Sequence, residues 1–240
     1  NLELCKFLHR QGIAVSAKDS SGYTPFHCVC EEGLFDIAAW MVTIGASCAL
    51  VDDKMMTPIH YACQHQRVDI IKAIILELLQ GKASDVERAA TLLLPDVAAS
   101  GLLKIVEYIL DMGCCSVNAK APEDGQSAMH RACRGGKLDL VKLLVRRKAD
   151  MTLRDYSEMT PFLHACSSGN LELVKYLASS GPKGILLDMD SNGDNALHFC
   201  TRTHDTEMVK WLLQRGLDCN QPNFKRCAAV DLPEASDWSE

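Results

Sequence analysis

The sequence predicts an all-α protein, a solenoid of about six stacked helix pairs with hairpin or turn connections and partial units at both ends. Two observations predict it. A four-residue motif returns at a nearly constant interval, and a stretch with helical spacing of apolar residues follows it each time. Of the 240 residues, 48% are hydrophobic but only 6% are aromatic. Small aliphatic side chains therefore have to fill most of the core.

The first helix of each pair is marked by a motif that runs Thr, Pro, an apolar residue and His in its fullest form. It begins at residues 24, 57, 127, 160 and 195, and one unit between 57 and 127 lacks it but keeps the following glycine, Gly101. With a degenerate unit at 228–231, the spacings are 33, 35, 35, 33, 35 and 33 residues. Pro is favourable in the first turn of a helix, where its missing N–H has no partner to lose. A short helix is therefore expected at each motif.

A second, longer helix is expected after the glycine that follows each motif. Its apolar residues recur at helical spacing, as Leu140, Val141 and Leu144 show. Glycines such as Gly22 and Gly125 precede the motif and suit a turn with positive φ. The second helices are expected to begin near residues 35, 68, 103, 138, 171 and 206, and the chain opens inside another one at residues 2–5.

These repeats resemble the ankyrin-repeat family, whose consensus G-x-T-P-L-H-x-A is followed by a second helix that ends in G-A-D. The resemblance covers residues 1–232 as one repeat domain, and an acidic tail without repeats follows at 233–240. The half unit at the start is expected to belong to a longer protein. The resemblance implies a rigid, non-catalytic module that binds other proteins.

Two stretches depart from the repeat. The unit at about 80–125 is irregular, and residues 82–94 are expected to be helical or irregular because their turn glycine and Thr-Pro are missing. Residues 181–184 interrupt the turn that should follow the fifth long helix. Such irregular units mark either a kink or partner site, or drift that a solenoid tolerates, and both interpretations stay open.

Charge and length exclude several functions. The formal charge is −6, from 25 basic and 31 acidic residues. Direct nucleic-acid binding is not expected, because it needs a positive surface. The longest uncharged stretch, 37–51, has 15 residues, and a membrane span needs roughly 18. We expect neither a membrane span nor a signal peptide.

The cysteines and histidines look like metal ligands only at first sight. Twelve cysteines occur without a CxxC pair, so we expect reduced, metal-free thiols in a cytoplasmic or nuclear protein. Helices stacked about 8–10 Å apart do not bring four ligands to one zinc ion. The resemblance makes the histidines of the motif turn braces and puts cysteines where a small buried Ala is usual. They are His27, His60, His130 and His198, and Cys30, Cys63, Cys133 and Cys166.

We predict a non-catalytic interaction module or scaffold, with no catalytic residues, metal or cofactor. It is expected to be a monomeric domain that holds a partner protein or peptide along its concave face. The resemblance places the exposed positions of that face at the turn tips and the ends of the first helices, where aromatic, methionine and charged side chains suit an interface. The predicted partner-binding residues are Tyr23, Glu31, Glu32, Met56, Tyr61, Gln64, His65, Gln126, Arg131, Arg134, Tyr156 and Met159.

Three alternatives stay open. Some ankyrin domains of histone methyltransferases read methyl-lysine with an aromatic cage, and Tyr23, Glu31 and Tyr61 match positions of that cage, although Cys28 replaces an aromatic residue. The chain is also typical of a regulatory or substrate-recruiting region of a larger enzyme or channel. Finally, residues 131–154 contain eight basic and two acidic residues, which favours either a solvated outer helix or a dock for an acidic segment.

Overall fold

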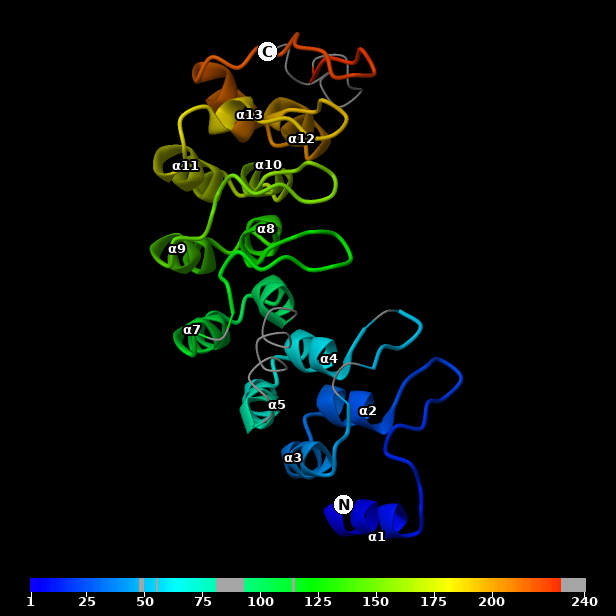
Figure 1. The fold of residues 1–240 in the computed structure, drawn as a ribbon. Helices are drawn as coiled ribbons and strands as arrows, with labels where there is room; N and C mark the ends of the chain where they lie inside the picture. The colour runs from blue at the N-terminus through cyan, green and yellow to red at the C-terminus, as the bar shows by residue number, and fades with distance from the viewer. Residues whose placement is uncertain (48–49, 55, 81–92, 114, 230–240) are drawn as a thin grey trace. The chain divides into compact units, whose positions relative to one another are not determined.

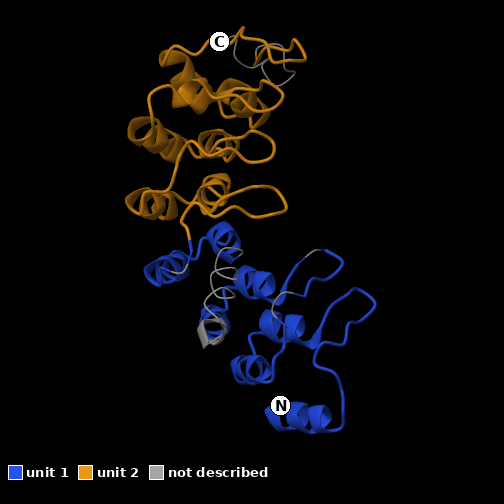
Figure 2. Cartoon of the chain, in the orientation of Figure 1, with its two compact units in different colours: residues 1–115 blue, residues 116–240 orange. Residues whose placement is uncertain are grey.

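The computed structural model describes residues 1–240 apart from 48–49, 55, 81–92, 114 and 230–240 (Figure 1). The chain forms two compact units, residues 1–115 and residues 116–240 (Figure 2). The predicted all-α architecture of stacked helix pairs is confirmed. In the described part, β structure is limited to isolated bridges such as Lys120 with Ser127.

Unit 1 begins with a single helix and continues with helix pairs. The Asn1 side chain caps the first helix by accepting hydrogen bonds from the N–H groups of Glu3 and Leu4. The next pairs follow the predicted order of a short helix and then a longer one. The elements are α1 (Leu2–Arg10), α2 (Pro25–Glu32), α3 (Phe35–Thr43), α4 (Pro58–Gln64), α5 (Val68–Gln80), an unlabelled helix at 93–99, and α7 (Leu103–Asp111).

Unit 2 contains three further pairs, with the long helices on one side and the short helices on the other (Figure 1). They are α8 (Ala128–Arg134) with α9 (Leu138–Arg146), α10 (Pro161–Ser167) with α11 (Leu171–Ser180), and α12 (Ala196–Arg202) with α13 (Thr206–Gln214). Among the described residues, no helix has both the length and the apolar character that crossing a membrane requires.

The two irregular stretches have different outcomes. Residues 82–92 lie outside the described residues, and the remaining two residues of the predicted 82–94 stretch are helical, since a helix spans 93–99. The interruption at 181–184 is confirmed: α11 ends at Ser180, and a short 3₁₀ helix, η1 (Ile185–Leu187), follows. The predicted extent of the repeat domain, 1–232, stays a prediction.

The motif histidines brace the turns, as predicted. In α2, Nδ1 of His27 accepts the N–H of Thr24 at 3.0 Å, so its ring proton lies on Nε2. That Nε2–H donates to the carbonyl of Met56 in the next repeat, at 3.0 Å. His130 and His198 make the same two kinds of contact in unit 2. Each histidine thus caps its own helix and ties it to the following turn.

The fourth brace differs. Nε2 of His60 lies 2.9 Å from a carboxylate oxygen of Asp96, in the helix at 93–99, instead of a backbone carbonyl. Asp96 belongs to the unit that lacks the motif, and its buried carboxylate stands where the other braces reach a backbone carbonyl. Sequence reasoning recognised His60 but not its partner, because no motif marks Asp96.

Within each unit, backbone hydrogen bonds join the turn before one motif to the turn before the next. The N–H of Tyr156 donates to the carbonyl of Asp124 at 3.0 Å, and the N–H of Phe224 donates to the carbonyl of Asn192 at 2.9 Å. The ring of Tyr156 lies so close to Gly125 (φ +71°) that a Cβ there would meet it at 2.6 Å. Gly125 is therefore needed for both its positive φ and its lack of a side chain.

Cysteines fill a repeated core position, as predicted for Cys30, Cys63, Cys133 and Cys166, all of which are buried. Burial raises the pKa of the Cys63 thiol to about 12 and raises that of Cys133 further. These thiols therefore stay protonated and behave as small apolar groups. Cys63, Cys133, Cys166 and Cys200 are free thiols, and the reduced state of all twelve cysteines stays a prediction.

Acid is expected to destabilise unit 2 through its buried histidines. Burial and the neighbouring His164 lower the pKa of His130 to about 4, and burial lowers the pKa of His164 as well. An unfolded histidine takes up its proton near pH 6.5. Unfolding therefore binds protons between about pH 6.5 and 4, and stability falls as the pH falls through this window. We expect His130 to contribute about 2 kcal/mol of loss between pH 7 and pH 5.

Urea unfolding followed by circular dichroism at several pH values measures this loss. His130→Gln should make the pH dependence shallower, because it removes a group that takes up a proton on unfolding. A wild-type stability that stays constant between pH 7 and pH 5 would contradict the account.

Candidate partner-binding site

The first two full repeats gather aromatic and acidic side chains on the short-helix side of unit 1. Tyr23 stands just before α2, and its ring stacks on His27 with centroids 5.1 Å apart. It also meets Tyr61 of α4 edge to face at 5.3 Å. Because His27 is fixed by its bonds to Thr24 and Met56, the histidine brace also positions the Tyr23 ring.

Glu31, at the end of α2, is held from several sides. The hydroxyl of Tyr23 donates to one carboxylate oxygen of Glu31, and Nε2 of His65 lies 3.7 Å from the other. Burial and this hydrogen bond raise the pKa of Tyr23, so its hydroxyl stays a donor. Nε of Arg67 donates to the backbone carbonyl of Glu31 at 3.2 Å. The Glu31 side chain remains 39% exposed, so a fixed carboxylate faces the solvent.

Tyr61, predicted as a partner-binding residue, is buried, so its side chain does not form part of the open surface. Only 9% of Tyr61 is exposed, and its hydroxyl donates to the buried carboxylate of Asp52 at 2.6 Å. This bond raises the pKa of Tyr61 to about 12. Burial opposes the charge on Asp52, but bonds from Tyr61 and the N–H groups of Met56 and Lys54 lower its pKa on balance. Tyr61 therefore supports the site from beneath.

The other predicted residues of unit 1 are accessible. Glu32, Gln64 and His65 are exposed, and Met56 is half-buried. Cys28 is exposed beside them, and the partial loss of water around its sulfur, together with the charges of Glu32 and Glu31, raises its pKa. The structure therefore places six of the seven predicted residues of unit 1 at a reachable surface: Tyr23, Glu31, Glu32, Met56, Gln64 and His65.

In unit 2, two predicted residues are more enclosed than expected. Gln126 is only 6% exposed, so the prediction that it lines an open surface is wrong. The Arg131 side chain is 13% exposed, and its guanidinium lies 2.9 Å from Asp124 and 3.7 Å from Glu123. Arg131 therefore fixes the preceding turn, because its charge is already paired and its stem is covered.

The remaining predicted residues of unit 2 are accessible. Arg134 is exposed, Met159 is half-buried, and Tyr156 is 68% exposed at its turn tip. Sequence reasoning missed Phe224, which is 75% exposed. Phe224 lies four residues before the degenerate motif at 228, just as Tyr156 lies four before 160, and that register could have revealed it.

An open aromatic cage does not form. A bound ammonium group needs ring faces within about 6 Å on more than one side. The rings of Tyr23 and Tyr61 touch each other edge to face, which leaves no gap between them, and Cys28 provides no third face. The geometry therefore does not favour methyl-lysine recognition.

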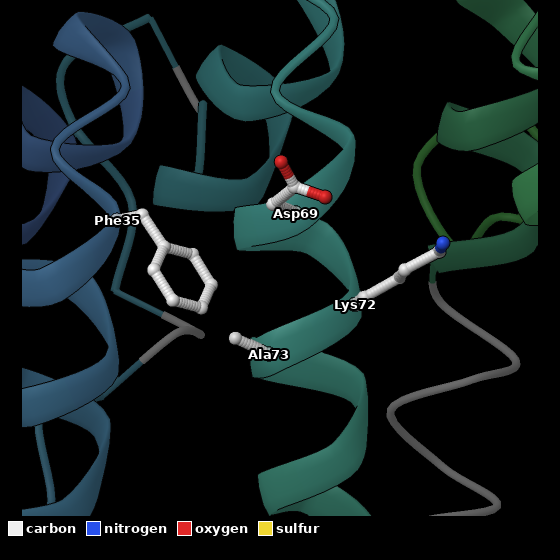
Figure 3. A pocket seen from close by; sticks show the side chains of 4 residues that line it. All are labelled: Phe35, Asp69, Lys72 and Ala73. Carbon is white, nitrogen blue, oxygen red and sulfur yellow. The ribbon is translucent and has the colours of Figure 1, made fainter.

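A shallow hollow lies elsewhere in unit 1, on the long-helix side. It is lined by Phe35 of α3 and by Asp69, Lys72 and Ala73 of α5. In Figure 3, Phe35 and Ala73 approach each other, whereas Lys72 points away to the other side of α5. Polar groups do not converge here as they do in a ligand site. In the described part of the chain, no three His, Cys, Asp or Glu side chains are grouped so as to hold a metal ion.

Comparison with known proteins identifies the class. A family model described as ankyrin repeats in three copies matches residues 1–90, 73–155 and 149–223. The chain therefore belongs to the ankyrin-repeat family, whose members are generally non-catalytic protein-interaction modules.

Several curated relatives share these repeats. The mouse B-cell lymphoma 3 protein homolog is 27% identical over 215 residues, which are 89% of this chain and 45% of that protein. An alpha-latrotoxin of Latrodectus geometricus is 27% identical over 75% of this chain and 13% of its own length. Human protein phosphatase 1 regulatory subunit 27 is 39% identical over 71 residues, 30% of this chain and 43% of that protein. The chain thus spans less than half the length of these relatives.

Removing the Tyr61 hydroxyl is expected to cost stability. Tyr61→Phe keeps the ring but leaves a buried oxygen of Asp52 without its donor, so the free energy of unfolding should fall by about 1–3 kcal/mol. Chemical denaturation measures the change, with Tyr156→Phe at an exposed tip as the matched control. If both variants were as stable as the wild type, the supporting role of Tyr61 would be refuted.

Proposed function

We propose that this chain binds a segment of a partner protein along the short-helix face of unit 1, with Tyr23, Glu31, Glu32, Met56, Gln64 and His65 as the contact residues. The observation that carries the proposal is the fixed, partly exposed carboxylate of Glu31, which Tyr23 and His65 hold in place. Binding to side chains that are already ordered loses little conformational entropy.

The composition of this surface also supports the proposal. It offers a ring edge, a thioether and exposed carboxylates close together, the mixture typical of an interface centre with a polar rim. The neighbouring turn is anchored by Asp52, which accepts the N–H groups of Lys54 and Met56 at 2.9 and 2.8 Å. Met56 therefore presents its side chain from a fixed backbone.

The proposed mode of action, oligomeric state and location of the chain rest on its sequence and on its membership of the ankyrin-repeat family. We propose that the chain acts without catalysis or cofactor, as a monomeric domain in the cytoplasm or nucleus, and that it does not bind nucleic acid directly. Contact that continues toward Arg131 and Arg134 in unit 2 stays a prediction. One relative is named a protein phosphatase regulatory subunit and another a cation channel, which supports a regulatory or recruiting region within a longer protein.

Substitution on this surface should weaken the partner. A partner obtained by affinity capture and mass spectrometry would be titrated by calorimetry against Tyr23→Ala and Met56→Ala. Each variant should lose more than about 1 kcal/mol of binding free energy if it is a hot spot. The double variant Arg146→Glu with Arg147→Glu, on a long helix of unit 2, should bind as the wild type does.

Two controls separate binding from folding. Met56→Ala should leave thermal stability almost unchanged, whereas Tyr23→Ala removes contacts to His27 and Tyr61 and should lower it slightly. Tyr23→Phe keeps those ring contacts and removes only the bond to Glu31. The assignment would be reversed if the Arg146 and Arg147 double variant failed to bind while the variants at Tyr23 and Met56 bound normally.

A further inference from the structure

We propose that the long-helix face of unit 2 is a second binding surface, which takes an extended acidic segment of another protein with carboxylates at about every third residue. The surface is separate from the one proposed above, since it lies on different helices of a different unit. Its centre is a row of three lysines, here called the lysine ladder: Lys142, Lys175 and Lys210.

The ladder follows from the repeat. Each lysine is the fifth residue of its helix, in α9, α11 and α13 respectively. Equivalent positions in successive repeats face the same way, so the three ammonium groups form a row across the unit. Lys175 and Lys210 are exposed and Lys142 is half-buried. Among the described residues, none of the three lies within ion-pair distance of a carboxylate.

The surrounding face is basic although the chain is acidic. The three long helices and the residues just after them, 138–148, 171–183 and 206–216, hold eight basic and three acidic residues, a net charge of +5. The whole chain carries −6. The acidic residues are Asp139, Glu172 and Glu207, which form a second row one helical turn before the ladder. A binding partner therefore meets positive charge concentrated along the ladder and the helix ends beyond it.

Aromatic rings lie next to the ladder. Tyr176 and Trp211 directly follow two of the lysines and are half-buried. Nζ of Lys142 lies 5.9 Å from the centre of the Tyr176 ring, which places α9 and α11 side by side here. The guanidinium of Arg215 lies 4.7 Å from the centre of the Trp211 ring. These contacts restrict the basic side chains and offer ring surface to apolar groups between a partner's carboxylates.

The spacing of the ladder selects the form of the partner. Lys142 of α9 reaches the Tyr176 ring of α11, and packed helices lie on the order of 10 Å apart; we take that value as the repeat distance of the lysines. A polyproline II chain has three residues per turn and rises about 3.1 Å per residue, so every third side chain points the same way at intervals of about 9 Å. Acidic side chains with a period of three would each meet one lysine.

The same spacing disfavours other polyanions. Duplex DNA carries about one charge per 1.7 Å of its axis. Such a dense anion would be only partly neutralised by the ladder and would be repelled by Asp139, Glu172 and Glu207. A membrane surface is bound by apolar side chains that insert into it, whereas the rings of Tyr176 and Trp211 are half-buried and lie against Lys142 and Arg215. An extended peptide with widely spaced carboxylates can reach the lysine ladder and still keep its carboxylates away from Asp139, Glu172 and Glu207.

Two synthetic peptides test the proposal. Both have ten residues of the same composition, with four Glu separated by Ser, Ala and Pro; in one the Glu occupy every third position, and in the other they are contiguous. Fluorescence anisotropy of the labelled peptides with the 240-residue chain at low salt should show at least fivefold tighter binding of the spaced peptide. Lys175→Glu with Lys210→Glu should weaken it at least tenfold.

A matched variant controls for net charge. Lys72→Glu with Lys104→Glu makes the same charge change in unit 1, where Lys72 is the fifth residue of α5, and should leave binding of the spaced peptide within twofold. Circular dichroism melting should show that both double variants remain folded. Tyr23→Ala should not affect this peptide, which keeps the test independent of the surface on unit 1.

Several results would overturn the proposal. It fails if neither peptide binds, if the contiguous peptide binds as tightly as the spaced one, or if the unit 1 double variant loses as much affinity as the ladder variant. It also fails if single-stranded DNA or vesicles with 30% phosphatidylserine bind more tightly than the spaced peptide, since the partner would then be a different anion.

Discussion

The histidine brace is the interaction on which the rest of this structure depends. In one ring, Nδ1 caps the first helix and Nε2–H holds the next turn, as His27 does between Thr24 and Met56. A stacked solenoid has few contacts between distant repeats, so its order rests on such links between neighbours. Because the ring of Tyr23 lies on His27, the link that builds the stack also sets the geometry of the candidate site.

Much of the fold could be predicted from the sequence, because the residues that mark each repeat have strong local conformational preferences. Thr-Pro and Asn start helices, glycine supplies positive φ, and apolar spacing defines the long helices. The helices at 25–32 and 161–167 begin at the predicted motif. The brace between His60 and Asp96 was not predictable, since it joins a motif to a unit that has lost its own.

The candidate site was predicted less completely, because exposure depends on what each side chain finds in space. Tyr23 and Tyr61 lie in neighbouring repeats with their rings in contact, yet Tyr61 reaches the buried Asp52 and Tyr23 reaches a solvent-facing Glu31. Arg131 and Arg134 lie one turn apart, but Asp124 holds only the first. The position of a residue within the repeat does not distinguish these cases. Phe224 was not predicted because the motif that follows it is degenerate.

The two faces proposed for binding differ in chemistry, which lets one measurement separate them. The central claim is that the short-helix face of unit 1 holds the partner, and hydrogen–deuterium exchange with and without the captured partner tests it most directly. The account predicts slower amide exchange in the complex at residues 19–33, 52–54 and 56–66, which contain the braced turns and the ends of the short helices. Protection confined to the long helices, with those segments unchanged, would contradict it.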